Sequence, residues 1–339
     1  RVQILRGQGR VRLKAVLTTG FGGAEVLRPG EADKPSPGAG QVLVRVAATS
    51  VNGPDIVQRE GNYPPPPGES EILGLEVAGT IEEIGQEVSG WSVGDPVMTL
   101  VGGGGYAEYA VAYADHLMPV PASMSFEEAA CVSETYITAY LNVFMNGGLK
   151  NGDSVLLHGG GGGVNTAAVQ LCKALTPDTR VIVTASTGKL ERVRGLGVDR
   201  VIDYRAQDFA EEVLDYTDRK GVQVILDHIG AAYLASNMKS LAVGGRLVVI
   251  GVTGGIRAEL NLAVMMVKRQ QIIGSVLRSR PVAEKAAIVA EFTRVVLPLL
   301  SLREIVPLVY QTYGIDDVAR AHRDMEASAH FGKIVLSFR

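Results

Sequence analysis

Residues Val155 to Ala168 read VLLHGGGGGVNTAA, so that an apolar run stops at five consecutive glycines and then resumes at helical spacing. The pattern predicts a buried strand, a tight turn and a helix. Such a turn lets backbone N–H groups approach a pyrophosphate, and the helix offers the positive end of its dipole. A second apolar strand, Val181 to Ala185, follows at the spacing of a βαβ unit. The stretch therefore predicts a dinucleotide site, and the missing Gly-Lys-Ser/Thr triplet excludes a P-loop.

The end of the second strand indicates which nicotinamide cofactor is preferred. Enzymes that select the unphosphorylated form place an acid there, against the ribose hydroxyl. Here residues 184–189 read TASTGK, three hydroxyls and a cation without an acid. NADPH is therefore favoured, with Lys189 as the best candidate for its 2′-phosphate. Arg192 and Arg194 either add positive charge or are simply exposed helix residues.

Composition restricts the kind of partner. The 339 residues are 46% hydrophobic and carry a formal net charge of −3, so that no basic field would attract nucleic acid or an anionic membrane. Cys131 and Cys172 are too few for a disulfide framework and lack the spacing of a structural zinc site. No apolar run approaches the ~20 residues of a spanning helix. We expect a cytoplasmic protein without a membrane or nucleic-acid partner.

The first fourteen residues form a local basic segment, with five cations before the first acid, Glu25. It resembles the remnant of an organelle transit sequence, but it lacks the usual serines, and an added leader fits as well. A mitochondrial location therefore stays open beside the cytoplasmic one.

The order of elements predicts two domains. Alternating strands and turns up to about residue 119 predict a barrel-like β domain that begins with Leu13 to Leu17 and Val42 to Ala48. Strands and helices then alternate from residue 154 to residue 276, which predicts an α/β, doubly wound parallel sheet of the Rossmann type. The last strand, Gly332 to Phe338, resembles the first domain. We therefore expect a discontinuous substrate domain of residues 1–137 and 300–339, and an NADPH-binding domain of residues 138–299.

Nearly the whole chain resembles the medium-chain dehydrogenase/reductase superfamily, in its zinc-free quinone oxidoreductase branch. The likeness is strongest to the p53-inducible quinone oxidoreductases, in residues 32–41, 58–79, 133–139, 275–280 and 332–336, and zeta-crystallin is a more distant relative. The resemblance implies that the discontinuous domain has the GroES-like fold.

The resemblance also bears on metal binding. Alcohol dehydrogenases of the superfamily carry a Cys ligand in the segment that here reads VNGPD (51–55), and a His ligand in the segment that reads GLE (74–76). Both ligands are missing, no Cys cluster forms a structural zinc lobe, and the five histidines are scattered. We expect no metal, with Glu76 kept as a buried structural residue. Without a Lewis acid, reduction of an electron-poor quinone needs less assistance than oxidation of an alcohol.

The resemblance implies that Asn52, Asp55 and Tyr63 line the substrate cleft, where each could hydrogen-bond a carbonyl oxygen. Their plainer interpretations are a helix cap, a surface helix acid and a wall residue. His158 could suggest acid–base work, but a hydrogen-bonded histidine at a strand end is the favoured interpretation.

The cofactor contacts implied by the resemblance come from several parts of the second domain and from the returning end of the chain. Thr138 would lie near the nicotinamide ribose, Ser186 and Lys189 at the 2′-phosphate, and Tyr204 against the adenosine unless it is a half-exposed strand-end aromatic. The contacts at the pyrophosphate would be Gly160, Gly161, Gly162, Gly163 and Val164. Those at the carboxamide would be Gly251, Val252 and Thr253. The residues that close over the cofactor would be Ser279, Arg280, Gly332 and Lys333.

Two positions depart from the family pattern. Asn165 stands where the glycine turn normally has a third glycine, although asparagine tolerates unusual backbone angles and can hydrogen-bond locally. Val57 stands where some bacterial relatives have a second tyrosine, which makes the cleft more apolar.

Three functions are compatible with these observations. The first is metal-free, NADPH-dependent reduction of quinones by direct hydride transfer, with either a one-electron or a two-electron outcome. The second is reduction of activated C=C bonds in enones or enoyl thioesters, with Tyr63 as candidate proton donor. The third is an NADPH-binding protein with a structural or RNA-binding role. The resemblance also implies a homodimer, paired through the sheet edge from Gln271 to Val276.

Overall fold

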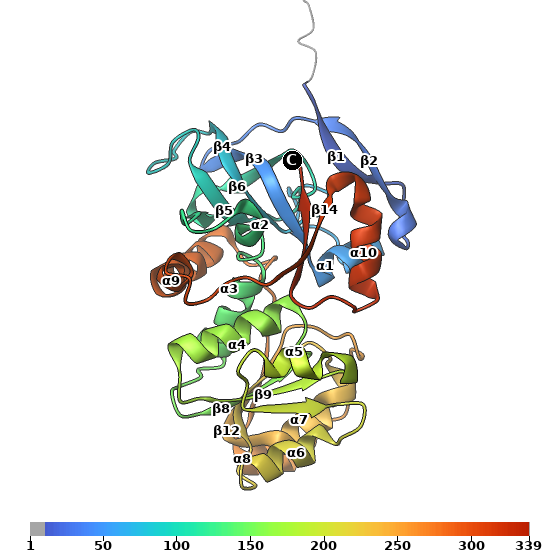
Figure 1. The fold of residues 1–339 in the computed structure, drawn as a ribbon, viewed down its shortest axis with the longest axis vertical. Helices are drawn as coiled ribbons and strands as arrows, with labels where there is room; N and C mark the ends of the chain where they lie inside the picture. Colours follow the sequence, from blue (N-terminus) through green and yellow to red (C-terminus); the bar gives the residue numbers. More distant parts are fainter. Residues whose placement is uncertain (1–10, 339) are drawn as a thin grey trace, which may run out of the picture.

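The computed structural model describes residues 11–338, and it shows two lobes stacked along the long axis of the molecule (Figure 1). The basic segment is therefore outside the described residues except for its last four positions. No helix among the described residues has the length and apolar character needed to cross a bilayer.

The second lobe is built on a six-stranded, wholly parallel sheet in the order β10-β9-β8-β11-β12-β13. Counted along the chain, this is the 3-2-1-4-5-6 order of a dinucleotide-binding fold, with its switch point between β8 and β11. The predicted doubly wound sheet is confirmed. Its strands are β8 (Ser154–His158), β9 (Arg180–Ala185), β10 (Arg200–Asp203), β11 (Val222–Asp227), β12 (Leu241–Val249) and β13 (Gln271–Gly274). The helices of this lobe are α4 (Gly163–Leu175), α5 (Leu190–Arg194), α6 (Phe209–Tyr216), α7 (Leu234–Ser240) and α8 (Leu262–Lys268).

The first lobe is mostly β-structure. Its seven-stranded sheet runs β14-β15-β3-β4-β5-β7, with β6 also paired to β3, and the described strands do not close into a complete barrel. These strands are β3 (Gln41–Val51), β4 (Glu76–Ile84), β5 (Pro96–Leu100), β6 (Tyr109–Tyr113), β7 (Leu117–Pro119), β14 (Val309–Gly314) and β15 (Lys333–Ser337). A separate antiparallel pair, β1 (Arg12–Thr18) and β2 (Leu27–Asp33), packs beside them. The helices of this lobe are α1 (Gly53–Arg59), α2 (Phe126–Ala129) and α10 (Val318–Glu326).

The end of the chain returns to the first lobe, as expected. Strand β15 pairs antiparallel with β3, with Ile334 opposite Val51, and Lys333 at its start lies beside the glycine turn. Gly332 donates its backbone N–H to the carbonyl of Gly161 across 3.0 Å, so that the returning chain is hydrogen-bonded to the second lobe. This return positions the site between the lobes.

Two helical segments join the lobes. The helix α3 (Thr135–Tyr140) continues as one π-helical turn (Leu141–Asn146) into the strand before the glycine turn. The helix α9 (Val282–Ser301) packs on the first lobe, where His116 donates from Nε2 to the carbonyl of Val282 across 3.0 Å. We propose that residues 1–137 and 300–339 form one domain and that residues 138–299 form the other. The second boundary then lies within the last turn of α9.

The strand β2 and the helix α8 were not predicted from the sequence. Strand β2 contains Pro29 and Gly30, which are unfavourable in strands and usually mark turns. Several apolar residues of α8 point outward, with Leu262, Met266 and Val267 between 69% and 73% exposed, whereas Met265 packs against the core. Because six of its seven residues are apolar, the helix lacks the alternation of apolar and polar faces that gives the usual periodic signal.

Candidate active site between the two lobes

The glycine turn connects β8, whose five residues are all buried, to α4. A Cβ atom at Gly160 would lie 2.4 Å from Cγ1 of Val183, and one at Gly163 would lie 2.5 Å from Cδ of Lys333. A side chain is therefore excluded at Gly160, and one at Gly163 would have to displace Lys333. The N–H groups of Gly163, Val164 and Asn165 stand in the first turn of α4, where the helix has no acceptors to offer them. This arrangement fits an anionic pyrophosphate.

Asn165 replaces the third glycine of the family pattern, and its side chain holds the turn together. Its Nδ2 donates to the carbonyl oxygens of His158 and Gly159, the latter at 3.1 Å, and the residue is 4% exposed. The expected local hydrogen bonding of Asn165 is confirmed.

His158 is 1% exposed, and both of its ring nitrogens have partners. Its Nδ1 lies 3.0 Å from Oγ1 of Thr184, and its Nε2 lies 2.7 Å from Oδ1 of Asn237. Burial lowers the pKa of His158 to about 3. The interpretation of His158 as a hydrogen-bonded structural residue is confirmed.

Several cationic side chains gather beside the turn. A Cβ atom at Gly161 would lie 2.6 Å from Cδ of Lys189, so the lysine stem lies over the turn. Burial and the charge of Arg192 lower the pKa of Lys189. Burial, Lys189 and Lys333 lower the pKa of His330 to about 4, and its Nδ1 is buried without a hydrogen-bond partner. A bound phosphate would relieve the repulsion among these groups, and the residues present therefore fit a dinucleotide.

An acid that was not predicted at this place lies close to the end of β9. The Oγ1 of Thr187 donates to Oδ2 of Asp203, at the end of β10, across 2.6 Å. This bond lowers the pKa of Asp203 and keeps it a carboxylate. The acid that contacts the ribose hydroxyl is expected at the end of the second strand of this fold, β9. Asp203 stands instead at the end of the third strand, β10.

Asn52 and the glycine turn line one cavity of about 100 Å³ between the lobes. Of the predicted site residues, this cavity brings six together: Asn52, Gly162, Gly163, Val164, Gly332 and Lys333. Tyr204, residues 251–253, Ser279 and Arg280 do not line it. Tyr204 is 39% exposed with Arg205 above its ring, and Thr253 donates to the carbonyl of His228 across 3.1 Å. Arg280 is tied to its own segment by bonds to Val276 and Glu284.

A buried polar cluster forms the floor of the cleft. Asn52 and Asp55 form the capping box of α1, and Nδ2 of Asn52 donates to Oε1 of Glu76 across 3.0 Å. Lys333 donates to Oδ1 of Asn52, and also to Oε1 of Glu76 across 3.1 Å. The expectation that Glu76 is a buried structural residue is confirmed, since it is 0% exposed. The segments that hold zinc ligands in alcohol dehydrogenases thus carry the amide of Asn52 and the carboxylate of Glu76 here, and the ammonium of Lys333 on β15 donates to both. Residues 11–338 contain no group of three or more metal-ligating side chains.

Asp55 is completely buried, so its interpretation as a surface helix acid is wrong. Its Oδ2 accepts from the backbone of Asn52 (2.8 Å) and from the hydroxyl of Tyr106 (3.2 Å), and its Oδ1 accepts from the backbone of Gly74 (3.0 Å). Burial nevertheless raises the pKa of Asp55 to about 6. These bonds orient the start of α1 and with it Asn52.

Tyr63 is held by a residue that sequence reasoning missed, Arg278. The guanidinium of Arg278 lies 5.1 Å from the centroid of the Tyr63 ring and donates to the carbonyl of Gly102 and to Gln58, both at 2.8 Å. Because Arg278 follows β13 of the second lobe, this contact joins the lobes around the aromatic ring. Burial is the main cause that raises the pKa of Tyr63.

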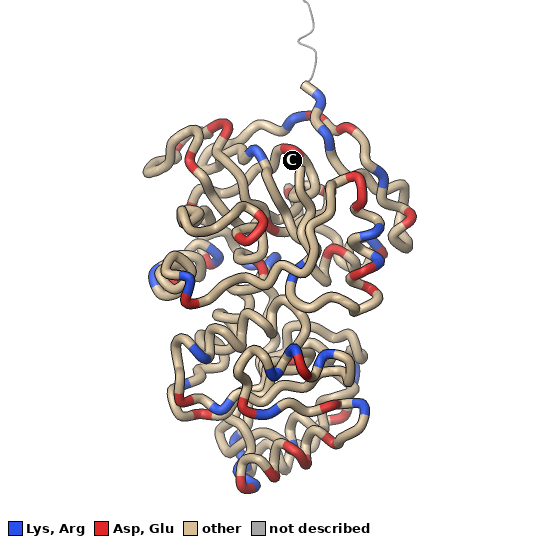
Figure 2. Tube along the Cα trace, in the orientation of Figure 1, with Lys and Arg blue, Asp and Glu red and all other residues tan. Residues whose placement is uncertain are grey.

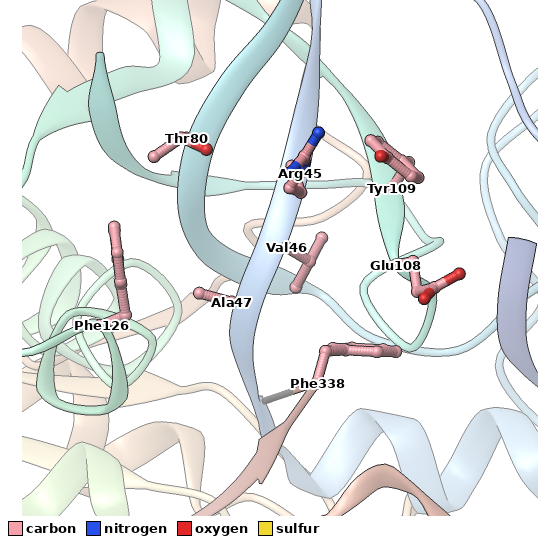
Figure 3. A pocket seen from close by; sticks show the side chains of 8 residues that line it. All are labelled: Arg45, Val46, Ala47, Thr80, Glu108, Tyr109, Phe126 and Phe338. Carbon is pink, nitrogen blue, oxygen red and sulfur yellow. The ribbon is translucent and has the colours of Figure 1, made fainter. Parts of the chain in front are cut away.

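Larger hollows do not coincide with this site. A groove of about 350 Å³ on the first lobe is lined by side chains of Arg45, Thr80, Tyr109, Phe126 and Phe338, among others (Figure 3). It contains none of the predicted site residues. Charge does not single out a face either, because acidic and basic residues are interspersed over both lobes (Figure 2).

Two family models match the chain. Residues 38–122 match the alcohol dehydrogenase GroES-like domain, and residues 196–336 match the zinc-binding dehydrogenase family. The class defined by the fold and the site is thus that of a two-domain dehydrogenase or reductase.

Known relatives narrow this class. The quinone oxidoreductase of Lama guanicoe is 33% identical over 97% of this chain and 98% of its own length. The synaptic vesicle membrane protein VAT-1 homolog of Danio rerio is 32% identical over 96% of this chain and 70% of its own. The chain belongs to the zinc-free quinone oxidoreductase branch of the medium-chain dehydrogenase/reductase superfamily.

Two solved structures are similar over almost the whole chain. The apo form of JamJ enoyl reductase matches with a TM-score of 0.86 and 25% identity, covering 96% of this chain and 99% of that one. Mycobacterial Rv1454c complexed with NADPH matches with a TM-score of 0.83 and 30% identity, with the same coverage. The family and this neighbour support an oxidoreductase that uses a nicotinamide cofactor.

Proposed function

We propose that the protein reduces quinones with NADPH, by direct hydride transfer in a metal-free cleft between the lobes. The observation that carries this proposal is that the glycine turn of one lobe and Asn52 of the other line the same cavity. A nucleotide held at the turn would bring its nicotinamide toward the buried cluster of the first lobe. Relatives named quinone oxidoreductase support the choice of substrate.

In this proposal the pyrophosphate lies against residues 160–164, and Lys189 and Ser186 hold the 2′-phosphate. NADPH supplies a hydride when it is bound. The protein's own residues bind and orient: Asn52 offers its amide to a substrate oxygen, Asp55 fixes the helix that carries Asn52, and Tyr63 closes the cleft. Lys333 and Gly332 close the turn from the other lobe. Thr138, Tyr204, residues 251–253, Ser279 and Arg280 stay proposed contacts along the rest of the dinucleotide.

The test is a panel of substrates with NADPH and NADH compared side by side. The proposal expects consumption of NADPH with naphthoquinones, formation of the hydroquinone and weaker activity with NADH. Equal use of the two nucleotides would contradict the cofactor assignment, and no turnover of any quinone would contradict the reaction.

Reduction of activated C=C bonds is the second candidate. The likeness to the JamJ enoyl reductase favours it, as does the position of Tyr63, whose phenol is held between the lobes by Arg278. A crotonyl thioester that is turned over far faster than any quinone would select this function.

We also propose a homodimer formed through β13, which pairs on one side with β12 and has no second partner strand in the described chain. Exposed apolar side chains of α8 flank this edge and would be covered by a second copy. We further propose a cytoplasmic location, since Cys131 and Cys172 are buried and free.

A further inference from the structure

One carboxyl group in the cleft is used neither by the fold nor by the mechanism above. Between residues 129 and 143, the side chains of Glu134 and Thr138 are half-buried and all the others are buried. The two positions are four residues apart along α3 and its N-cap, and they therefore lie on one face of the helix. With Thr138 as the proposed nicotinamide contact, this face would be turned toward the reacting part of the cleft.

Charged and titratable groups surround Glu134 on several neighbouring elements. They are Glu76 on β4, Asp55 on α1, Lys333 on β15, Lys285 on α9, Arg278 after β13 and Tyr63 in the loop after α1. The backbone N–H of Glu134 donates to Oε2 of Glu76 across 2.8 Å, which fixes the start of α3 beside a buried carboxylate.

The three cations near Glu134 are already engaged. The ammonium of Lys333 donates to Asn52 and Glu76, and the guanidinium of Arg278 donates to Gly102 and Gln58. The ammonium of Lys285 donates to the carbonyl of Arg278 across 3.1 Å. None of the three makes an ion pair with Glu134 among the described residues. Burial first, and then the charge of Glu76, raise the pKa of Glu134 to about 8. This upward shift favours the neutral carboxylic acid over the carboxylate near pH 7.

We propose that Glu134 is the proton donor of the reduction, an inference that rests on the proposed function. Two-electron reduction of a quinone adds one hydride and one proton. The C–H bond at the nicotinamide of NADPH breaks, its electron pair and hydrogen pass to the quinone, and the nicotinamide is oxidised. The O–H bond of Glu134 then breaks as a new O–H bond forms on the reduced oxygen. The carboxylate of Glu134 regains its proton from water.

Tyr63 is the alternative donor, and the surroundings favour Glu134 over it. Burial raises the pKa of Tyr63 above its ordinary value of 10, and the charge of Glu134 raises it further. A general acid is most effective when its pKa lies near the working pH, and Glu134 meets this condition while Tyr63 does not.

The first measurement compares the pH profile of kcat for quinone reduction in the wild type, in Glu134→Gln and in Glu304→Gln, an exposed control. General acids contribute about 10²-fold or more to rate. We expect Glu134→Gln to lower kcat at pH 7 by about that factor, with KM changed less than about threefold. Wild-type kcat should fall above a pH of about 8 and Glu304→Gln should behave as wild type, while Glu134→Gln should lack this alkaline fall. A Glu134→Gln enzyme with wild-type kcat and the same alkaline fall overturns the proposal.

The second measurement needs no substrate. Because the folded pKa of Glu134 lies above its ordinary value of 4.5, unfolding releases a proton between these two values. The free energy of unfolding therefore falls as pH rises from about 4.5 to about 8, and Glu134→Gln should reduce this fall. If the unfolding free energies of wild type and Glu134→Gln depend on pH in the same way, Glu134 is not a protonated acid in the folded protein and the proposal is overturned. If the wild-type protein reduces no quinone, the proposed function is overturned instead. The two measurements therefore distinguish a wrong proton donor from a wrong function.

Discussion

The ammonium of Lys333 on β15 donates to the carboxylate of Glu76 on β4 across 3.1 Å, and the two side chains are 5% and 0% exposed. This buried ion pair joins the last strand of the chain to the middle of the first lobe, and it continues through Asn52 to the start of α1. It therefore fixes the cleft floor and the position of Gly332 over the glycine turn.

Replacing Lys333 by methionine should leave the Glu76 carboxylate buried without its cation. Breaking a buried pair in this way costs about 3–5 kcal/mol of unfolding free energy. The matched control is Lys173→Met, which removes an ion pair with Asp199 whose partners are 30% and 33% exposed, and should cost less than about 1 kcal/mol. Denaturant unfolding measures both. Equal losses of unfolding free energy in the two variants would show that the buried Lys333–Glu76 pair stabilises the fold no more than an exposed pair does.

Replacing Gly160 by alanine should disturb the turn itself, because the added Cβ would meet Val183 at 2.4 Å and Val193 at 3.0 Å. Overpacking of this kind costs about 1–3 kcal/mol, and the displaced backbone should weaken dinucleotide binding. Gly314→Ala is the control, since no atom lies within 4 Å of its added Cβ. Thermal unfolding and nucleotide titration follow the two effects. An unchanged Gly160→Ala protein would mean that the turn is looser than described.

Lys189→Ala should separate the two nucleotides. A charge-assisted hydrogen bond to the 2′-phosphate contributes about 1.5–3 kcal/mol, so the Kd for NADPH should rise about tenfold or more while that for NADH stays nearly constant. Calorimetric titration gives both constants. If the Kd values for NADPH and NADH rise equally, Lys189 contributes to the binding of either nucleotide and does not contact the 2′-phosphate.

Ile272→Lys should weaken the proposed dimer, because a lysine on an edge strand opposes pairing with a second edge. Ile272 is 36% exposed on β13, and Val93, 65% exposed on the first lobe, provides the control Val93→Lys. Sedimentation at several concentrations should show monomer for the first variant and wild-type behaviour for the second. A monomeric wild type would contradict the dimer directly.

The fold was largely predictable because its signals are local. The glycine run between an apolar strand and a helix predicted the second lobe, and the capping position of Asn52 was visible in the sequence. Helix α8 was missed because six of its seven residues are apolar, so that no polar face marks it as an amphipathic helix. Strand β2 was missed because its proline and glycine are typical of turns.

The site was predictable only in part, because its decisive contacts join distant segments. Arg278 reaches Tyr63 from 215 positions along the chain, and Glu134 meets Glu76 from 58 positions away. Asp203 reaches Thr187 from a neighbouring strand end. Spacing rules describe one strand or one helix at a time, so they do not reveal such pairs. The likeness to known reductases suggested Asn52 and Tyr63 as cleft residues but did not indicate Arg278 or Glu134.

The central claim is that a phosphorylated nicotinamide dinucleotide binds across the glycine turn, and a crystal soaked with NADPH tests it most directly. We predict density for the pyrophosphate at the N–H groups of Gly163 and Val164, and a 2′-phosphate within hydrogen-bonding distance of Lys189. An empty turn at saturating NADPH, or a nucleotide bound elsewhere, would contradict the account.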